Sequence, residues 1–106
     1  MRAIIMKVDP VDWLVQEVTD LLDASSVGLY EFMLLLRGAY PERSESELRF
    51  YAANALKRLR ETGCGDLVSL KWPAEDVVQK AIPEEPQPAD WESPDEGGEY
   101  LAIARN

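Results

Sequence analysis

The chain has 106 residues, of which 46% are hydrophobic and 29% are charged, and its formal net charge is -9. This length suits one compact domain, 1–106, and such an ordinary composition argues against wholesale disorder. The negative charge disfavours long-range attraction to phosphate backbones and membrane surfaces, and it is compatible with a basic protein partner.

The charge is unevenly distributed along the chain. Residues 1–72 have nine Lys/Arg and eleven Asp/Glu, whereas residues 73–106 have two and nine. Five of the seven prolines also lie in the second part. We therefore expect a helical body with a first wing strand over 1–72, an acidic proline-rich excursion over 73–98 and a final strand over 99–106.

Apolar runs and the cysteine content are the sequence features that bear on targeting and compartment. No apolar run approaches the roughly 20 residues that cross a bilayer, and the apolar stretch near the N-terminus is too short to indicate a signal peptide. The single cysteine, Cys64, cannot form an internal disulfide. We expect a cytoplasmic protein.

The first helix is predicted to begin at Asp9-Pro10, because Asp caps free backbone amides and Pro suits the first helical position. Apolar residues then recur at three- and four-residue steps and predict one buried face: Val11, Leu14, Val15, Val18, Leu21 and Leu22. Residues Ala3 to Lys7 are predicted to add a short strand to the sheet.

The second helix is predicted over Val27 to Arg37, with a cap from Ser25-Ser26 and an end at Gly38 and Pro41. The run from Phe32 to Leu36 is apolar on too many sides for a surface helix. Burial between the other two helices is favoured, and contact with a partner is the alternative.

The third helix has the clearest pattern. Ser44 and Glu47 form a Ser-x-x-Glu capping box, and Gly63 supplies a left-handed residue at the end. Between them, one narrow stripe is predicted to face the core: Leu48, Ala52, Ala55, Leu56 and Leu59.

A strand is predicted over Leu67–Trp72, and a second over Tyr100–Ala104 with Leu101 and Ile103 on one face. The two are expected to pair antiparallel. Between them, Ala74 to Ile82 is interpreted as a two-turn helix. The four prolines of residues 83–94 predict a long wing tip without regular structure.

A helix with an apolar stripe that runs through Gly63 into a strand resembles the third helix and first wing strand of winged-helix domains. The resemblance covers residues 9–72 and the final strand, and it implies an α+β fold: three helices, a small antiparallel wing sheet and a long acidic wing loop. In winged-helix DNA readers the third helix enters the major groove. By position, the DNA-facing residues would be Ser46, Arg49, Ala53, Lys57 and Arg60, but the acidic wing tip departs from that pattern.

Catalytic chemistry is not indicated. The chain has no His, which removes the commonest general base. Cys64 lies between two glycines without a visible activating partner, so a turn or packing role is favoured. The adjacent acids Glu84-Glu85 and Asp95-Glu96 are interpreted as solvated. We expect no enzyme activity, no cofactor and no metal site.

Protein binding is indicated by aromatic residues outside the core stripe. Phe50 projects away from that stripe, and such a large aromatic needs a second layer of the chain or a partner. One hypothesis places Trp91 on Phe50 with the acidic tail over the basic stripe. Otherwise they form an acidic-aromatic surface for a basic protein, and its residues are Phe50, Trp91, Glu84, Glu85, Asp95 and Glu96.

The function we expect is that of an acidic protein-interaction module, for example an inhibitor or immunity-type protein that binds a basic partner. The alternative is a winged-helix DNA-binding transcriptional regulator that uses the helix over 44–62, with a dimer as its expected form.

Overall fold

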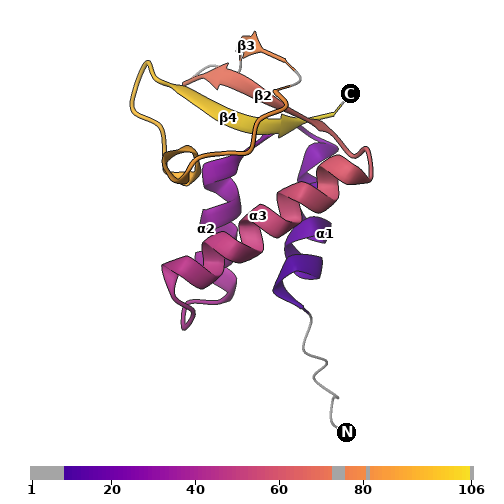
Figure 1. The fold of residues 1–106 in the computed structure, drawn as a ribbon, viewed down its shortest axis with the longest axis vertical. Coiled ribbons are helices and arrows are strands. Elements are labelled where there is room, and N and C mark those ends of the chain that lie inside the picture. Colours follow the sequence, from indigo (N-terminus) through magenta and orange to yellow (C-terminus); the bar gives the residue numbers. More distant parts are fainter. Residues whose placement is uncertain (1–8, 73–75, 81, 106) are drawn as a thin grey trace, which may run out of the picture.

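The computed structural model describes residues 9–72, 76–80 and 82–105, which form three α-helices, one short 3₁₀ helix and a four-stranded antiparallel sheet (Figure 1). The strand order is β1-β4-β2-β3. The helices lie on one side of the sheet, and α3 crosses in front of α1 and α2 in the view of Figure 1. The predicted α+β class with a small antiparallel sheet is confirmed, and the arrangement is winged-helix-like.

Helix α1 (Pro10–Leu22) begins as predicted. Asp9 Oδ1 accepts hydrogen bonds from the backbone N–H groups of Val11 and Asp12, at 2.8 and 3.3 Å. The buried face is narrower than the predicted one, because Val15 is half-buried and Leu21 is exposed. The strand predicted at Ala3 to Lys7 lies outside the described residues.

Helix α2 (Leu29–Ala39) begins two residues later than predicted, and Ser25-Ser26 does not cap it. Val27–Gly28 instead forms the short strand β1, which pairs with β4. The backbone N–H of Gly28 then donates to Glu31 Oε1 at 2.9 Å, so a carboxylate in the first turn satisfies this amide. The helix also continues through Gly38, which the sequence interpretation treated as a stop.

The apolar run of α2 is mostly buried in the core. Phe32, Met33 and Leu36 are almost completely inaccessible, whereas Leu34 is exposed. Helix α2 packs against α1, α3, the sheet and the 3₁₀ helix. Burial within the domain therefore accounts for most of the run.

Helix α3 (Glu45–Glu61) confirms the predicted signals at both ends. The Ser44 hydroxyl accepts from the backbone N–H of Glu47 at 3.2 Å, and the Glu47 carboxylate accepts from the backbone N–H of Ser44 at 3.2 Å. Gly63 follows the helix with a φ of 75°, which favours glycine. All five residues of the predicted core stripe are buried.

The central pair of the sheet is β2 (Asp66–Lys71) and β4 (Glu99–Ala104), which run antiparallel as predicted, with Leu67 opposite Ile103. The helix predicted over 74–82 is wrong for its described residues. Asp76–Gln79 forms β3 and pairs with the open edge of β2. Val77 and Val78 are β-branched and favour an extended strand over a helix.

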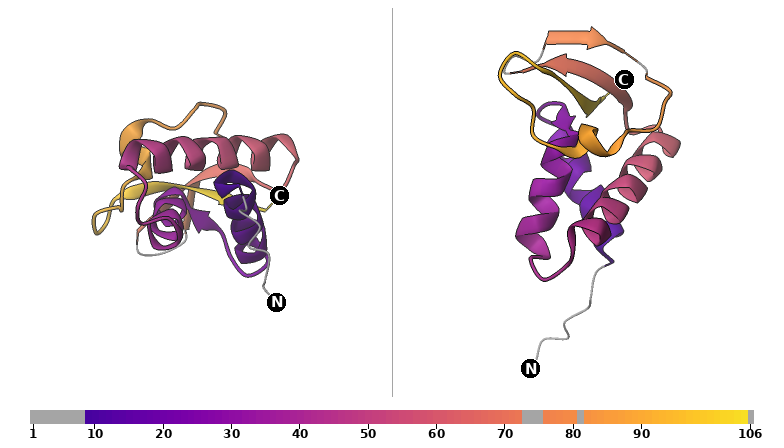
Figure 2. Two further views of the ribbon diagram at one scale, coloured as in Figure 1. Left: turned by 90° about the horizontal axis from the view of Figure 1, so that it is seen from below. Right: turned by 60° about the vertical axis from the view of Figure 1, so that its left-hand side comes forward.

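The acidic proline-rich excursion is folded back onto the helices. The Ile82 N–H donates to Leu67 O at 2.9 Å, and the Trp72 N–H donates to Gly98 O at 2.8 Å, so residues 82–98 are tied to the chain of β2 at both of their ends. The excursion contains the 3₁₀ helix η1 (Pro88–Trp91), although the sequence interpretation expected no regular structure there. Figure 2 shows this part of the chain passing beside α3.

Candidate functional site

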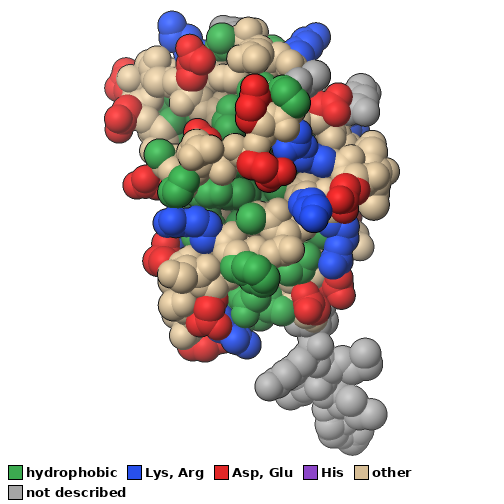
Figure 3. Space-filling model, viewed as in Figure 1, with side chains coloured by type: hydrophobic (Ala, Val, Ile, Leu, Met, Phe, Trp, Pro, Cys, Tyr) green, Lys and Arg blue, Asp and Glu red, His purple; other side chains and the backbone are tan. Residues whose placement is uncertain are grey.

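The candidate site is the outward surface of α3, opposite its core stripe, which we call the α3 face. Because Leu48, Ala52, Ala55, Leu56 and Leu59 face inward, the opposite positions point to solvent or to the excursion. Figure 3 shows apolar atoms exposed over α3 among Lys/Arg and Asp/Glu side chains. We define the α3 face by Ser46, Arg49, Phe50, Ala53, Lys57 and Arg60.

Phe50 stands at the centre of the α3 face with 65% of its surface exposed. Its ring lies edge-on to that of Tyr51, with centroids 6.3 Å apart. A hollow of about 340 Å³ lies on the side of Phe50 toward α1, and it is lined by Asp9, Val11, Asn54, Lys57, Arg58 and Glu61. Phe50 also lines a second hollow, on its side away from α1, so this apolar side chain has a hollow on each side.

The second hollow beside Phe50 has a volume of about 370 Å³, and residues 82–91 form its other wall. We call it the proline hollow, and it is lined by Ser46, Arg49, Phe50, Ala53, Pro86, Pro88 and Trp91. Sequence reasoning missed Pro86 and Pro88 as site residues. Their Pro-x-Pro spacing marks an extended segment, but nothing local tells which helix that segment contacts.

Residues 82–91 are also fixed to the C-terminal half of α3. Arg60 Nη2 donates to the carbonyl oxygen of Ile82 at 2.9 Å. A third hollow, of about 160 Å³, is lined by Leu56, Lys57, Arg60, Glu61 and Glu85. An acidic residue of the excursion thus lies beside two cations of the α3 face.

Trp91 is almost completely buried, so it is not the exposed aromatic of the predicted acidic-aromatic surface. Its role in partner binding stays a prediction. Only 4% of its surface is exposed, and its ring packs on Phe32 of α2 with centroids 5.9 Å apart. Trp91 and Phe50 do line the same hollow, but Trp91 belongs to the core and Phe50 does not. An aromatic residue among acids gives no sequence signal that separates these two roles.

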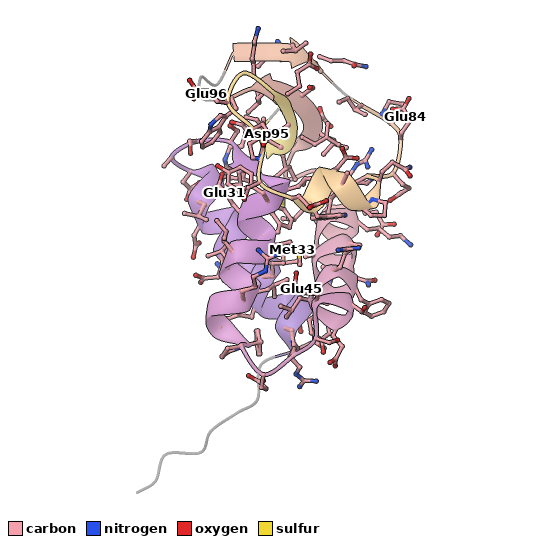
Figure 4. The ribbon with its side chains drawn as sticks, turned by 90° about the vertical axis from the view of Figure 1, so that its left-hand side faces the viewer. Glu31, Met33, Glu45, Glu84, Asp95 and Glu96 are labelled. Carbon is pink, nitrogen blue, oxygen red and sulfur yellow. The ribbon has the colours of Figure 1, made fainter. Side chains whose placement is uncertain are left out.

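The predicted acidic residues do not form one patch. Figure 4 shows Glu84 on one side of the molecule, whereas Asp95 and Glu96 lie on the other side, above Glu31. Glu85 lines a hollow of α3 together with Lys57. The structure therefore places Glu85 beside α3 and separates Glu84 from Asp95 and Glu96.

The cations of the α3 face differ in their hydrogen-bond and ion-pair partners. Arg49 is half-buried, and its Nε is buried without a hydrogen-bond partner in the described part of the chain. Within 9–72, 76–80 and 82–105, neither Arg49 nor Lys57 makes an ion pair. Arg60, by contrast, is held by Ile82.

The carboxylates at the start of α3 already have partners. The Arg37 guanidinium donates two hydrogen bonds to Glu45, at 2.7 and 3.0 Å, and they lower the pKa of Glu45, with a smaller contribution from the charge of Arg49. The backbone N–H and hydroxyl of Ser44, followed by Arg43, lower the pKa of Glu47. The two carboxylates in the first turn of α3 are therefore already bound by Arg37 and by Ser44 and Arg43, and neither forms an ion pair with Arg49.

The described residues offer few groups of the kinds that take part in catalysis or metal binding. Cys64 is half-buried and its Sγ lies 3.3 Å from the Thr62 hydroxyl. Among those residues, no group of three or more His, Cys, Asp or Glu side chains could hold a metal ion. No helix of the described chain has the length and apolar character to cross a membrane.

Comparison of the chain with protein-family models, curated proteins and solved structures gives no match.

Proposed function

We propose that the protein is a non-enzymatic interaction module that binds a basic protein through the α3 face. The observation that supports this most is the exposure of Phe50, at 65%, at the centre of a helix face with a hollow on each side. A large exposed aromatic beside hollows is typical of an interaction hot spot.

The charge of the molecule supports the choice of a basic partner. A net charge of -9 attracts a cationic protein at long range and raises its association rate. Glu84 and Glu85 are exposed, and Glu85 borders the α3 face directly. An inhibitor or immunity-type protein that blocks a basic enzyme, such as a nuclease, is one concrete version.

A cytoplasmic location belongs to the same proposal. It is supported by the single cysteine, which leaves no internal disulfide.

DNA binding is the alternative. It is favoured by the winged-helix-like arrangement and by Arg49 and Lys57, which make no ion pair with other described residues. Two contacts weigh against it. Pro86 and Pro88 border Arg49 and Ala53, and Glu85 lies beside Lys57, so residues 82–91 occupy part of the surface that would enter a groove.

The test is capture and identification of the partner from the source cells, followed by titration of that purified partner against the full chain. We expect a basic protein whose affinity decreases between 50 and 200 mM NaCl. Phe50→Asp should weaken the complex by at least about tenfold, as expected for a hot-spot residue.

Leu34→Asp is the matched control, because Leu34 is also an exposed apolar helix residue, at 51%, but lies on α2. This substitution should change the affinity less than twofold. A 20-base-pair duplex should be titrated in parallel. The proposal fails if the duplex binds more tightly than the protein, with a steep salt dependence, or if Phe50→Asp leaves the captured partner's affinity unchanged.

A further inference from the structure

The proline hollow combines an apolar lining with one cation, Arg49, that makes no ion pair in the described part of the chain. Ala53, Pro86, Pro88 and the rings of Phe50 and Trp91 supply the apolar surface, and Arg49 and Ser46 supply the polar groups. Its volume of about 370 Å³ is near the lower end of the range for small-molecule sites. A hollow of this volume has room for one large side chain together with a terminal carboxylate.

Arg49 indicates the charge of that occupant. Its Nε is buried and has no hydrogen-bond partner in the described residues, and a buried donor without an acceptor is unfavourable. The charge of Arg49 helps to lower the pKa of Glu45, but the Glu45 carboxylate is already bound by two nitrogens of Arg37. A guanidinium in this state prefers a planar carboxylate that can accept two hydrogen bonds.

Geometry favours a chain end over an acidic side chain. In an extended peptide, successive side chains point to opposite sides, so an Asp and its apolar neighbour would not enter one small hollow together. A carboxyl-terminal residue has its carboxylate and its side chain on the same Cα. Both groups can therefore enter one hollow, with the carboxylate at Arg49 and the side chain against Phe50 and the prolines.

We propose that the proline hollow binds the carboxyl-terminal residue of a polypeptide partner, with an aromatic or large apolar side chain. This deepens the proposed function, on which it rests, because it names the part of the partner that the α3 face holds. A basic protein satisfies both requirements when its last residue is apolar.

The experiment is an NMR titration of the full chain, labelled with ¹⁵N, with N-acetyl-L-phenylalanine and separately with N-acetyl-L-phenylalaninamide. The first probe has the terminal carboxylate and the second lacks it. We expect shifts at Ser46 to Ala53 and at the Trp91 indole N–H, and about tenfold tighter binding of the carboxylate, as for a hydrogen-bonded charge pair.

Two variants assign this preference to Arg49. Arg49→Gln should reduce the difference between the two probes to less than twofold. Lys57→Gln is the matched control, because Lys57 is a cation of the same face that lines the other hollows. It should leave the preference unchanged, and thermal unfolding should show that both variants are folded.

Failure of both probes to bind overturns the inference, and so do three further outcomes. They are equal affinity for the two probes, shifts centred on Asn54 and Lys57 rather than Arg49, and a homodimer in sedimentation that Phe50→Asp converts to monomer. The last would mean that a second copy fills the hollow. Because the probes need no partner, a captured basic protein together with failed probe binding would leave the proposed function standing and reject this inference alone.

Discussion

Two aromatic side chains line the proline hollow, and they differ in burial by a wide margin. Trp91 is 4% exposed and packs on Phe32, whereas Phe50 is 65% exposed. A buried ring contributes to the free energy of folding through the area it removes from water, and an exposed ring contributes little. The two residues should therefore respond differently to truncation.

We expect Trp91→Ala to lower the free energy of unfolding by about 3 to 5 kcal/mol, because it empties a core site. Phe50→Ala should change it by less than about 0.5 kcal/mol, as for surface substitutions generally. Urea unfolding monitored by circular dichroism measures both. A loss below about 1 kcal/mol for Trp91→Ala would mean that residues 82–91 contribute little to the fold.

At the scale of elements, the parts predicted correctly are those with local signals. Helix α3 has the Ser44–Glu47 box, an apolar stripe and Gly63, and each acts within a few residues of the chain. The pairing of β2 with β4 was also predictable, because two alternating segments flank one excursion.

The elements that were missed depend on partners distant in sequence. Val27 and Gly28 become a strand because β4 is available to pair with them, 74 residues beyond Gly28 at Ala102. Val77 and Val78 become a strand because the edge of β2 is open. The proline hollow was missed for the same reason, since Pro86 reaches Arg49 only after the excursion folds back.

Two glycines provide a paired prediction at this scale. In Gly65, at the entry to β2, an added Cβ would lie 2.5 Å from the carbonyl oxygen of Ala104, which is backbone and cannot easily move. In Gly38, inside α2, an added Cβ would meet nothing within 4 Å. The first position excludes a side chain, and the second does not.

We expect Gly65→Ala to destabilise the protein by about 2 kcal/mol. Gly38→Ala should stabilise it by roughly 0.5 to 1 kcal/mol, because alanine costs less conformational entropy in a helix than glycine. Chemical denaturation of the two variants measures these values. Equal effects of the same sign would show that the close approach of Gly65 to β4 is not maintained in solution.

At the scale of the whole molecule, the negative charge exceeds what its ion pairs neutralise. The described residues make five ion pairs, all between exposed side chains: Arg37–Glu45, Arg43–Glu42, Arg43–Glu47, Arg58–Asp12 and Arg105–Asp23. Exposed pairs of this kind contribute little to stability. The repulsion among the remaining carboxylates acts over longer distances and opposes the compact state.

Salt weakens both the attraction within the ion pairs and the repulsion among the remaining carboxylates, and these two changes shift the stability in opposite directions. With a net charge of -9, we expect the loss of repulsion to be the larger effect. The Debye length decreases from about 30 Å at 0.01 M to about 8 Å at 0.15 M, so salt screens the long-range repulsion most. We expect the Tm to rise by about 4 °C between 10 and 150 mM NaCl, which corresponds to roughly 1 kcal/mol in a domain of this size.

A variant with four exposed acids neutralised tests the cause of this rise: Glu84→Gln, Glu85→Gln, Asp95→Asn and Glu96→Gln. Four fewer negative charges change the net charge from -9 to -5. None of the four acids forms an ion pair within the described ranges. Because self-repulsion scales with the square of the charge, the salt-induced rise in Tm should decrease to roughly a third. A Tm that falls with salt would instead mean that the five ion pairs outweigh the repulsion among the remaining carboxylates.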